Sequence, residues 1–139
     1  MTCIFCQIIE RKIPSSIVYE DDTVLAFMDI QPVNPGHVLV IPKKHAESVA
    51  ELDDETMGAL NVVCKKVNQA LRKSDLKVEG VNHFLADGEA AGQEVFHVHF
   101  HVFPRFANDG FGLKFKEDYA NLPPRSELDA AAGKIKKNC

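Results

Sequence analysis

Residues 97–102 of this chain read His97-Val98-His99-Phe100-His101-Val102. Side chains alternate between the two faces of a β-strand, so a strand here places the three histidines on one face and the three apolar residues on the other. The imidazole rings are then roughly 6.6–7 Å apart along the strand. Because imidazole titrates near neutral pH, transfers protons, binds metals and attacks electrophiles, we interpret this strand as the candidate active site.

A metal site is the alternative interpretation of the three histidines. Two histidines at positions i and i+2 can bind one ion, but the outer pair on a straight strand is roughly 13 Å apart. At most two of the rings could therefore share a metal. At least one ring remains for other chemistry.

Size and composition limit what the chain can be. A chain of 139 residues fits one domain, which we expect to span residues 1–139 and to bury a hydrophobic core. The net charge is −4 and the basic residues are scattered, which argues against nucleic-acid binding but allows a small phosphorylated ligand. No apolar run approaches the roughly 20 residues of a membrane helix, and no signal peptide is evident, so we expect a cytoplasmic protein.

The four cysteines do not suggest disulfides, because Cys3 and Cys6 form a close pair, Cys64 lies in a helical pattern and Cys139 is terminal. In a reducing compartment the pair Cys3-x-x-Cys6 indicates half of a metal site or a redox pair. A redox pair of this kind normally follows a strand, and no strand is predicted before Cys3, which favours metal. We expect Cys64 to be buried and Cys139 to be exposed.

Hydrophobic periodicity predicts both helices and strands. Asp53 has the position of an N-cap for a long helix whose apolar residues recur every three or four positions up to Lys73. A short amphipathic helix begins near Ile4, and Ser126 with Asp129 resembles a capping box that opens a last helix. The strands lack regular βαβ alternation, so we predict an α+β fold. The predicted strands are residues 17–20, 24–29, 37–41, 81–86 and 95–103.

Several stretches of the chain, in the right order, resemble the histidine-triad (HIT) family and its Hint branch. The histidine row is similar to the family's signature, His-x-His-x-His with apolar x. The resemblance covers about residues 3–105 and leaves residues 106–139 as a tail outside it. The matching stretches are Cys3–Ile9 with Ile13-Pro14, Leu25–Ile30, Gly36–His45 and Gly92–Val102.

The resemblance implies a HIT-like fold, in which a five-stranded antiparallel sheet carries one long helix and short terminal helices. It also implies a homodimer and hydrolysis or transfer at the α-phosphate of a purine nucleotide, as in a nucleoside phosphoramidase. Matched by position, His99 is the nucleophile that forms a covalent nucleotidyl-histidine intermediate, and His101 contacts phosphate oxygens and shuttles a proton. Neutral imidazole suits the nucleophile if its other nitrogen donates to a backbone carbonyl.

The same match assigns substrate contacts. Asp29 falls where the family's carboxylate holds the two ribose hydroxyls, which suits the two acceptor oxygens of a carboxylate. His37 is expected on a neighbouring strand, where it orients the triad, and Gln93 near the phosphates. The residues expected to sandwich the purine base, in addition to their packing in the core, are Phe5, Ile8, Phe27 and Ile30.

A zinc site is the expected role of the cysteine pair. Some bacterial members of the family with this pair are similar to the present chain, and their remaining ligands map to His45 and His97. With Cys3 and Cys6 these histidines make a Cys2His2 set, which is a standard structural zinc site with no open position. Zinc would hold the amino terminus against the core and orient the strand that carries His99.

Two positions depart from the family's pattern. Ala86 stands where an amide side chain is usual, and Glu94 stands where Ser or Thr is usual. The first change removes a phosphate contact, and the second could repel phosphate or protonate a departing amine. These departures leave open a nucleotide-binding regulatory protein with little turnover. A dinucleoside polyphosphate hydrolase also stays open, because residues 87–88, 91–93 and 101–105 resemble that branch of the family.

Overall fold

The computed structural model describes residues 3–139 of the chain and divides it into two units, one ending at Asp109 and one beginning at Gly110. The division falls close to residue 106, where the resemblance to the family ends. Within the described part of the chain, no helix has both the length and the apolar character needed to cross a lipid bilayer.

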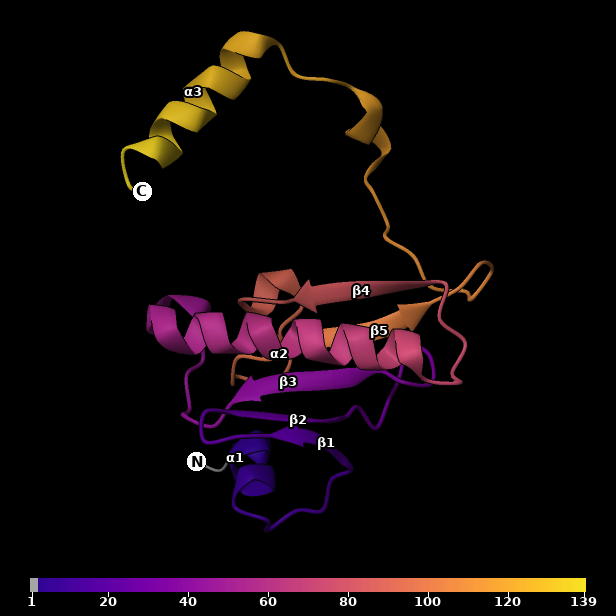
Figure 1. Ribbon diagram of the computed structural model, residues 1–139. Helices are drawn as coiled ribbons and strands as arrows, with labels where there is room; N and C mark the ends of the chain where they lie inside the picture. Colours follow the sequence, from indigo (N-terminus) through magenta and orange to yellow (C-terminus); the bar gives the residue numbers. More distant parts are fainter. Residues whose placement is uncertain (1–2) are drawn as a thin grey trace. The chain divides into compact units, whose positions relative to one another are not determined.

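A five-stranded antiparallel sheet forms the centre of the first unit (Figure 1), as the sequence predicts. The strand order across the sheet is β1-β2-β3-β5-β4, so β1 and β4 are the edges. Every neighbouring pair is antiparallel. The strands are β1 (Ile17–Glu20), β2 (Val24–Met28), β3 (Val38–Pro42), β4 (Gly80–Leu85) and β5 (Phe100–Arg105).

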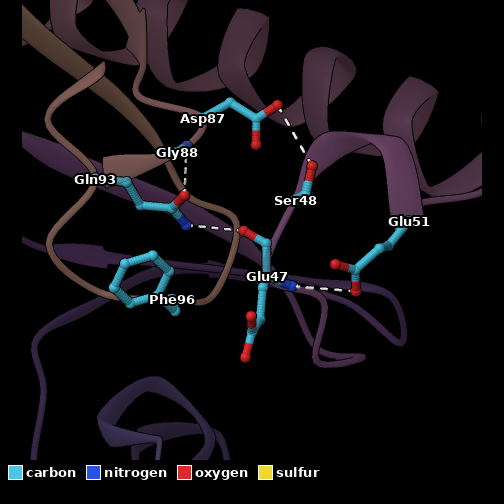
Figure 2. A pocket seen from close by; sticks show the side chains of 7 residues that line it. All are labelled: Glu47, Ser48, Glu51, Asp87, Gly88, Gln93 and Phe96. Atoms are coloured by element: carbon cyan, nitrogen blue, oxygen red, sulfur yellow. Dashed lines mark hydrogen bonds between the residues drawn. The ribbon is translucent and has the colours of Figure 1, made fainter. Parts of the chain in front are cut away.

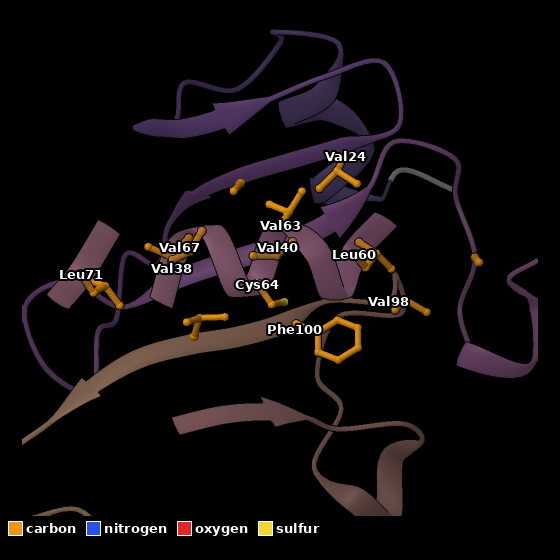
Figure 3. Packing of buried hydrophobic residues seen from close by; sticks show 13 residues of the cluster. Val24, Val38, Val40, Leu60, Val63, Cys64, Val67, Leu71, Val98 and Phe100 are labelled. Carbon is orange, nitrogen blue, oxygen red and sulfur yellow. The ribbon is translucent and has the colours of Figure 1, made fainter. Parts of the chain in front are cut away.

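Helix α2 (Asp54–Lys73) covers one face of the sheet. The predicted cap is confirmed, because the Asp53 carboxylate accepts a hydrogen bond of 2.7 Å from the Thr56 amide. The apolar stripe of α2 packs on one set of alternating strand residues (Figure 3), and each buried aliphatic side chain contributes about 1.5–3 kcal/mol. The packed residues are Val24, Ala26, Val38, Val40, Leu60, Val63, Cys64, Val67, Leu71, Val98, Phe100 and Val102.

Helix α1 (Ile4–Ile9) packs on the other face of the sheet. Its Phe5 and Ile8 are buried against the alternate residues of β2 and β3, so both faces of these central strands are covered. The strand residues in this second cluster are Leu25, Phe27, Leu39 and Ile41. Two short 3-10 helices complete the unit, η1 (Val49–Glu51) and η2 (Glu89–Ala91).

The predicted strand 95–103 is wrong at its start, because β5 begins only at Phe100. The main chain bends before this strand: the His97 amide donates to the Val95 carbonyl at 2.9 Å, and the Val98 amide donates to the Ala46 carbonyl at 2.8 Å. These local and loop contacts replace the ladder that a longer strand would form. The predicted separation of faces is nevertheless confirmed, since the apolar residues of the row lie in the core beneath α2.

The second unit holds the 3-10 helix η3 (Glu117–Ala120) and helix α3 (Arg125–Lys136). The helix lies where the sequence predicts it, but the predicted capping box is wrong. Pro124 occupies the N-cap position and no side chain caps the helix, since Ser126 is already within it. All residues of this unit are exposed.

Candidate active site and metal-binding cluster

His97 is completely buried and contacts both the cysteine pair and His99. Its Nε2–H donates to the Pro42 carbonyl at 2.8 Å, because a carbonyl can only accept. In the neutral ring the proton is therefore on Nε2, and Nδ1 carries a free lone pair. That Nδ1 lies 3.4 Å from the Cys3 Sγ and 3.7 Å from the Cys6 Sγ. Burial lowers the pKa of His97, which keeps the ring neutral.

The four predicted metal ligands meet in one cluster, Cys3, Cys6, His45 and His97. The His45 Nδ1 lies 3.2 Å from the His97 Nδ1 and 3.5 Å from the Cys6 Sγ. A tetrahedral ion with ordinary Zn–N and Zn–S bonds separates two nitrogens by about 3.3 Å and a nitrogen from a sulfur by about 3.5 Å. The spacing of the donor atoms therefore fits a metal ion with four protein ligands.

The four cysteines occupy three different environments. Burial and the adjacent Cys3 sulfur raise the pKa of Cys6 to about 11, so its thiolate needs a compensating cation. Cys64 is buried in α2 and Cys139 is exposed, as predicted, and all four thiols are free.

His99 precedes β5 and faces the side of the sheet that α1 covers. Its Nδ1–H donates to the His97 carbonyl at 2.7 Å, so the neutral ring carries a lone pair on Nε2. The Phe5 ring contacts the His99 ring edge-on at 5.1 Å between centroids. The ring is thus held by a main-chain hydrogen bond and by its contact with Phe5, in the state that a nucleophile requires.

His101 on β5 lies next to His99, with ring centroids 5.0 Å apart. Its Nδ1 is 2.9 Å from the Nε2 of His37, and the Nδ1 of His37 accepts a 3.0 Å hydrogen bond from the Val33 amide. Burial lowers the pKa of His37, and burial with the neighbouring His99 and His37 lowers the pKa of His101 to about 4. Both rings are therefore neutral near pH 7.

Asp29 follows β2 and lies beside the same two histidines. Its Oδ1 accepts from the Gln31 amide at 2.8 Å, and its Oδ2 is 3.5 Å from the His37 Nε2 and 3.9 Å from the His101 Nδ1. The structure thus brings this predicted ribose ligand to the triad.

The residues predicted to hold a base do not share one environment. Phe5, Ile8 and Phe27 are buried together beneath α1, with the two phenyl rings 5.5 Å apart and edge-on. Ile30 is 94% exposed. Core packing therefore accounts for three of the four, and Ile30 alone among them presents an open apolar surface.

Gln93 is buried, and its side-chain amide forms hydrogen bonds with main-chain groups of its own loop and of Glu47. Its Oε1 accepts from the Gly88 amide at 2.7 Å, and its Nε2 donates to the Glu47 and Val95 carbonyls at 2.8 and 3.1 Å. Figure 2 shows the contacts of Gln93 with Gly88 and Glu47. They lie at a pocket of about 260 Å³. The described residues that line the pocket include no triad histidine; they are Glu47, Ser48, Glu51, Asp87, Gly88, Gln93 and Phe96.

The two departures from the family's pattern lie in this loop. Ala86 is 4% exposed and Glu94 is exposed. The methyl group of Ala86 offers no hydrogen bond, so the amide contact expected there is lost.

Three contributors to the site were missed by sequence reasoning. The Pro42 carbonyl and the Val33 amide hold histidine rings, and the Phe84 ring on β4 contacts the His101 ring at 5.8 Å. Main-chain groups carry no residue-type signal, so no pattern could identify the first two. Phe84 could have been found from its register, because it pairs directly with His101.

Comparison with known proteins gives consistent matches. Residues 10–108 match the sequence model of the HIT domain. An uncharacterized HIT-like protein of Borreliella burgdorferi is 55% identical over 113 residues, which are 81% of each chain. The adenosine 5'-monophosphoramidase hnt1 of Schizosaccharomyces pombe is 42% identical over 81% of this chain and 80% of its own.

Solved structures agree with the fold. A HIT family protein from Bacillus anthracis has a TM-score of 0.90 and 40% identity, covering 99% of this chain and 97% of its own. A zinc-bound histidine triad family protein from Mycobacterium smegmatis has a TM-score of 0.77 and 35% identity, covering 100% and 99%. A histidine triad nucleotide-binding protein from Candida albicans has a TM-score of 0.86 and 33% identity, covering 99% and 96%.

Proposed function

Because the chain belongs to the HIT domain family, we propose that it is a hydrolase or transferase acting at the α-phosphate of purine nucleotides, with nucleoside phosphoramidates as substrates. The observation that carries the proposal is the hydrogen bond from the His99 Nδ1–H to the His97 carbonyl, which leaves a lone pair on Nε2. The name of the Schizosaccharomyces pombe relative supports this reaction class.

The reaction follows from the state of His99. In the first step its Nε2 forms a bond to phosphorus while the P–N bond of the phosphoramidate breaks, and the amine departs after nitrogen is protonated from solvent. In the second step a water oxygen attacks phosphorus and releases a proton to solvent, the P–Nε2 bond breaks with its electron pair returning to Nε2, and the nucleoside monophosphate leaves. Two displacements replace one difficult step. His101 supplies a hydrogen-bond donor for the phosphate oxygens, where negative charge gathers.

We propose that Asp29 and Ile30, which follow β2, recognise the nucleoside part of the substrate. The Asp29 carboxylate, already beside His37, is the proposed acceptor for the two ribose hydroxyls. The exposed Ile30 side chain is the proposed apolar contact for the purine. Binding of a base would remove this surface from water.

Adenosine 5′-phosphoramidate and diadenosine polyphosphates test the proposal directly. We expect AMP release from the phosphoramidate and a loss of at least about 10³-fold in the His99→Asn variant, as for other nucleophiles. His83→Asn is the matched control, because His83 on β4 contacts Asn68 and lies outside the triad. Full activity of His99→Asn would contradict the assignment of the nucleophile.

A nucleotide-binding protein with little turnover is the second candidate, and the buried methyl group of Ala86 favours it. Tight AMP binding without AMP release from either substrate supports this candidate over the enzyme. Faster cleavage of diadenosine polyphosphates than of the phosphoramidate supports the third candidate, a dinucleoside polyphosphate hydrolase.

We further propose that the metal is zinc and that Cys3, Cys6, His45 and His97 hold it. The zinc-bound relative from Mycobacterium smegmatis supports this choice. With four protein ligands the ion has no open position, so its contribution is structural. His97 then serves the triad by position, since its carbonyl holds the His99 ring.

The proposed function also implies a cellular compartment and a set of partners. The four free thiols suit a reducing compartment such as the cytoplasm. The proposed partners are a purine nucleotide or nucleotide conjugate and a second copy of the chain, with no role for a nucleic-acid polymer or a membrane.

A further inference from the structure

A chain of hydrogen bonds runs from the main chain at Val33 through His37 to His101. The Val33 N–H lies 3.0 Å from the His37 Nδ1, and the His37 Nε2 lies 2.9 Å from the His101 Nδ1. His37 is 3% exposed, and its ring also packs on Phe103 with centroids 4.8 Å apart. The ring therefore has little freedom to turn or flip.

The Val33 N–H is the first donor in this series of hydrogen bonds, and it determines which ring nitrogen carries the proton in His37 and in His101. A main-chain N–H can only donate, so the His37 Nδ1 is an acceptor without a proton. The neutral His37 ring must then carry its proton on Nε2. This N–H donates to the His101 Nδ1, so the neutral His101 ring carries its own proton on Nε2.

We propose that His37 is a positioning residue that locks His101 as a neutral imidazole with its proton on Nε2, so that a permanent hydrogen-bond donor, and not an acid, serves the phosphate. This inference rests on the proposed function for the identity of the acceptor. It concerns the protein itself, however, and holds before any substrate is bound.

A metal ion at Asp29, His37 and His101 is the competing interpretation of this cluster. The three ligand atoms are 2.9, 3.5 and 3.9 Å apart, which is close to the spacing around a tetrahedral ion. Binding through the His37 Nε2 would require its proton to move to Nδ1, where it would meet the Val33 N–H. The donor at Val33 thus favours a hydrogen bond between the rings.

An extra proton on either ring would break one of these hydrogen bonds. Protonation of the His37 Nδ1 opposes the Val33 N–H, and protonation of the His101 Nδ1 opposes the His37 N–H. The titratable groups that face His101 are His37, His99 and Asp29, and Asp29 also faces His37. The carboxylate favours a charged ring, but it is farther from both rings than they are from each other.

The tautomers can be measured directly in the purified protein labelled with ¹⁵N-histidine. Long-range ¹H–¹⁵N spectra distinguish protonated from unprotonated ring nitrogens, and spectra of single histidine variants assign the rings. At pH 7 we expect His37 and His101 each to carry one proton, on Nε2. A proton on the His101 Nδ1, or on both of its nitrogens, would overturn the proposal. This result is independent of any activity.

Two substitutions test the effect on turnover. In His37→Leu the His101 Nδ1 loses its donor, and we expect a kcat about 100-fold lower, the cost of losing one preorganised donor, together with a mixed tautomer at His101. The amide of His37→Gln can still donate, so we expect its kcat within about tenfold of the original. His83→Gln is the control for a histidine outside the site.

Each outcome of these variants decides the proposal. A His37→Leu protein that keeps both its turnover and a single Nε2–H tautomer at His101 would refute it. If His37→Leu does not fold, the tautomers of the unmodified protein and of His37→Gln still give the answer. If the protein cleaves no phosphoramidate, the proposed function fails, while the spectra still test whether His37 fixes the tautomer of His101.

Discussion

At the residue scale, main-chain groups and a neighbouring ring give the three histidines of the row three different tasks. The Pro42 carbonyl accepts from the Nε2–H of His97 and leaves Nδ1 for the proposed metal ion. The His97 carbonyl accepts from the Nδ1–H of His99 and leaves Nε2 for the proposed attack on phosphorus. His37 occupies the Nδ1 of His101 and leaves an N–H donor. One residue type is thus suited to three proposed functions, because each ring has a different partner.

The low pKa of His101 predicts a loss of stability in acid. In the unfolded chain the ring binds a proton below its ordinary pKa of 6.5, while the folded ring stays neutral down to a pKa of about 4. The contribution of His101 to the free energy of unfolding is therefore complete above pH 6.5 and is lost as the pH falls towards 4. Urea denaturation between these pH values measures it.

His101→Asn isolates this contribution from acid effects at the metal ligands. We expect the stability of the variant to fall less steeply than that of the original protein over the same pH range. Parallel curves for the two proteins would show that His101 is not held neutral by the fold.

At the element scale, α1 depends on what surrounds it. A helix of six residues is not stable alone in water. Phe5 and Ile8 bury its apolar face, and Cys3 and Cys6 tie its first turn to His45 and His97. The same Phe5 ring contacts His99. Metal binding at one end of α1 should therefore stabilise both the amino terminus and the nucleophile.

Removal of the metal tests this dependence. We expect the purified protein to contain about one zinc per chain, and Cys3→Ser to lose most of it and to unfold at a lower temperature. An ion present at 100 times its dissociation constant adds about 2.7 kcal/mol to the stability. Cys139→Ser is the matched control, since Cys139 is exposed and far along the chain from the cluster. A metal-free protein with unchanged stability and activity would reject the site.

The N-cap of α2 gives a second prediction at this scale. Asp53→Ala removes the acceptor for the Thr56 amide and should lower the free energy of unfolding by about 1 kcal/mol. Asp54→Ala is the matched control, because Asp54 is the first helical residue, where a carboxylate stabilises the helix dipole by about 0.3–1 kcal/mol. Urea denaturation should rank Asp53→Ala as the more damaging change, and the reverse order would contradict the capping role.

At the scale of the whole molecule, the sheet ends in an edge strand that lies next to the site. Among the described residues, β4 has a neighbouring strand only on the side of β5, and its Phe84 is 43% exposed while contacting His101. An open edge with an exposed aromatic residue invites pairing with another strand. Antiparallel pairing of two β4 strands would join two sheets around a twofold axis.

We therefore expect a dimer in solution. Sedimentation equilibrium should give a mass of twice 15.4 kDa at micromolar concentration. A single species of 15.4 kDa under these conditions would contradict it.

Properties that depend on neighbours along the chain were predictable. The periodicity of α2, its cap at Asp53, the buried Cys64 and the separation of faces in the histidine row all follow from local patterns, and the structure confirms them. The resemblance to the family added the ligands His45 and His97, which meet the cysteine pair in the structure. The start of β5 was not predictable, because the hydrogen bond from the Val98 amide to the Ala46 carbonyl, in a loop distant in sequence, makes the strand begin late.

The sequence of residues 97 to 101 by itself determines the row of three alternating imidazoles, and its chemistry can be recognised without the fold. For His97 and His101, the order of residues along the chain does not determine which ring nitrogen holds the proton. The position of that proton depends on the carbonyl of Pro42, 55 positions from its histidine, and on His37, 64 positions from its partner. Such pairs meet only when the strands pack, because a hydrogen bond forms between groups that are close in space, whatever their separation in sequence.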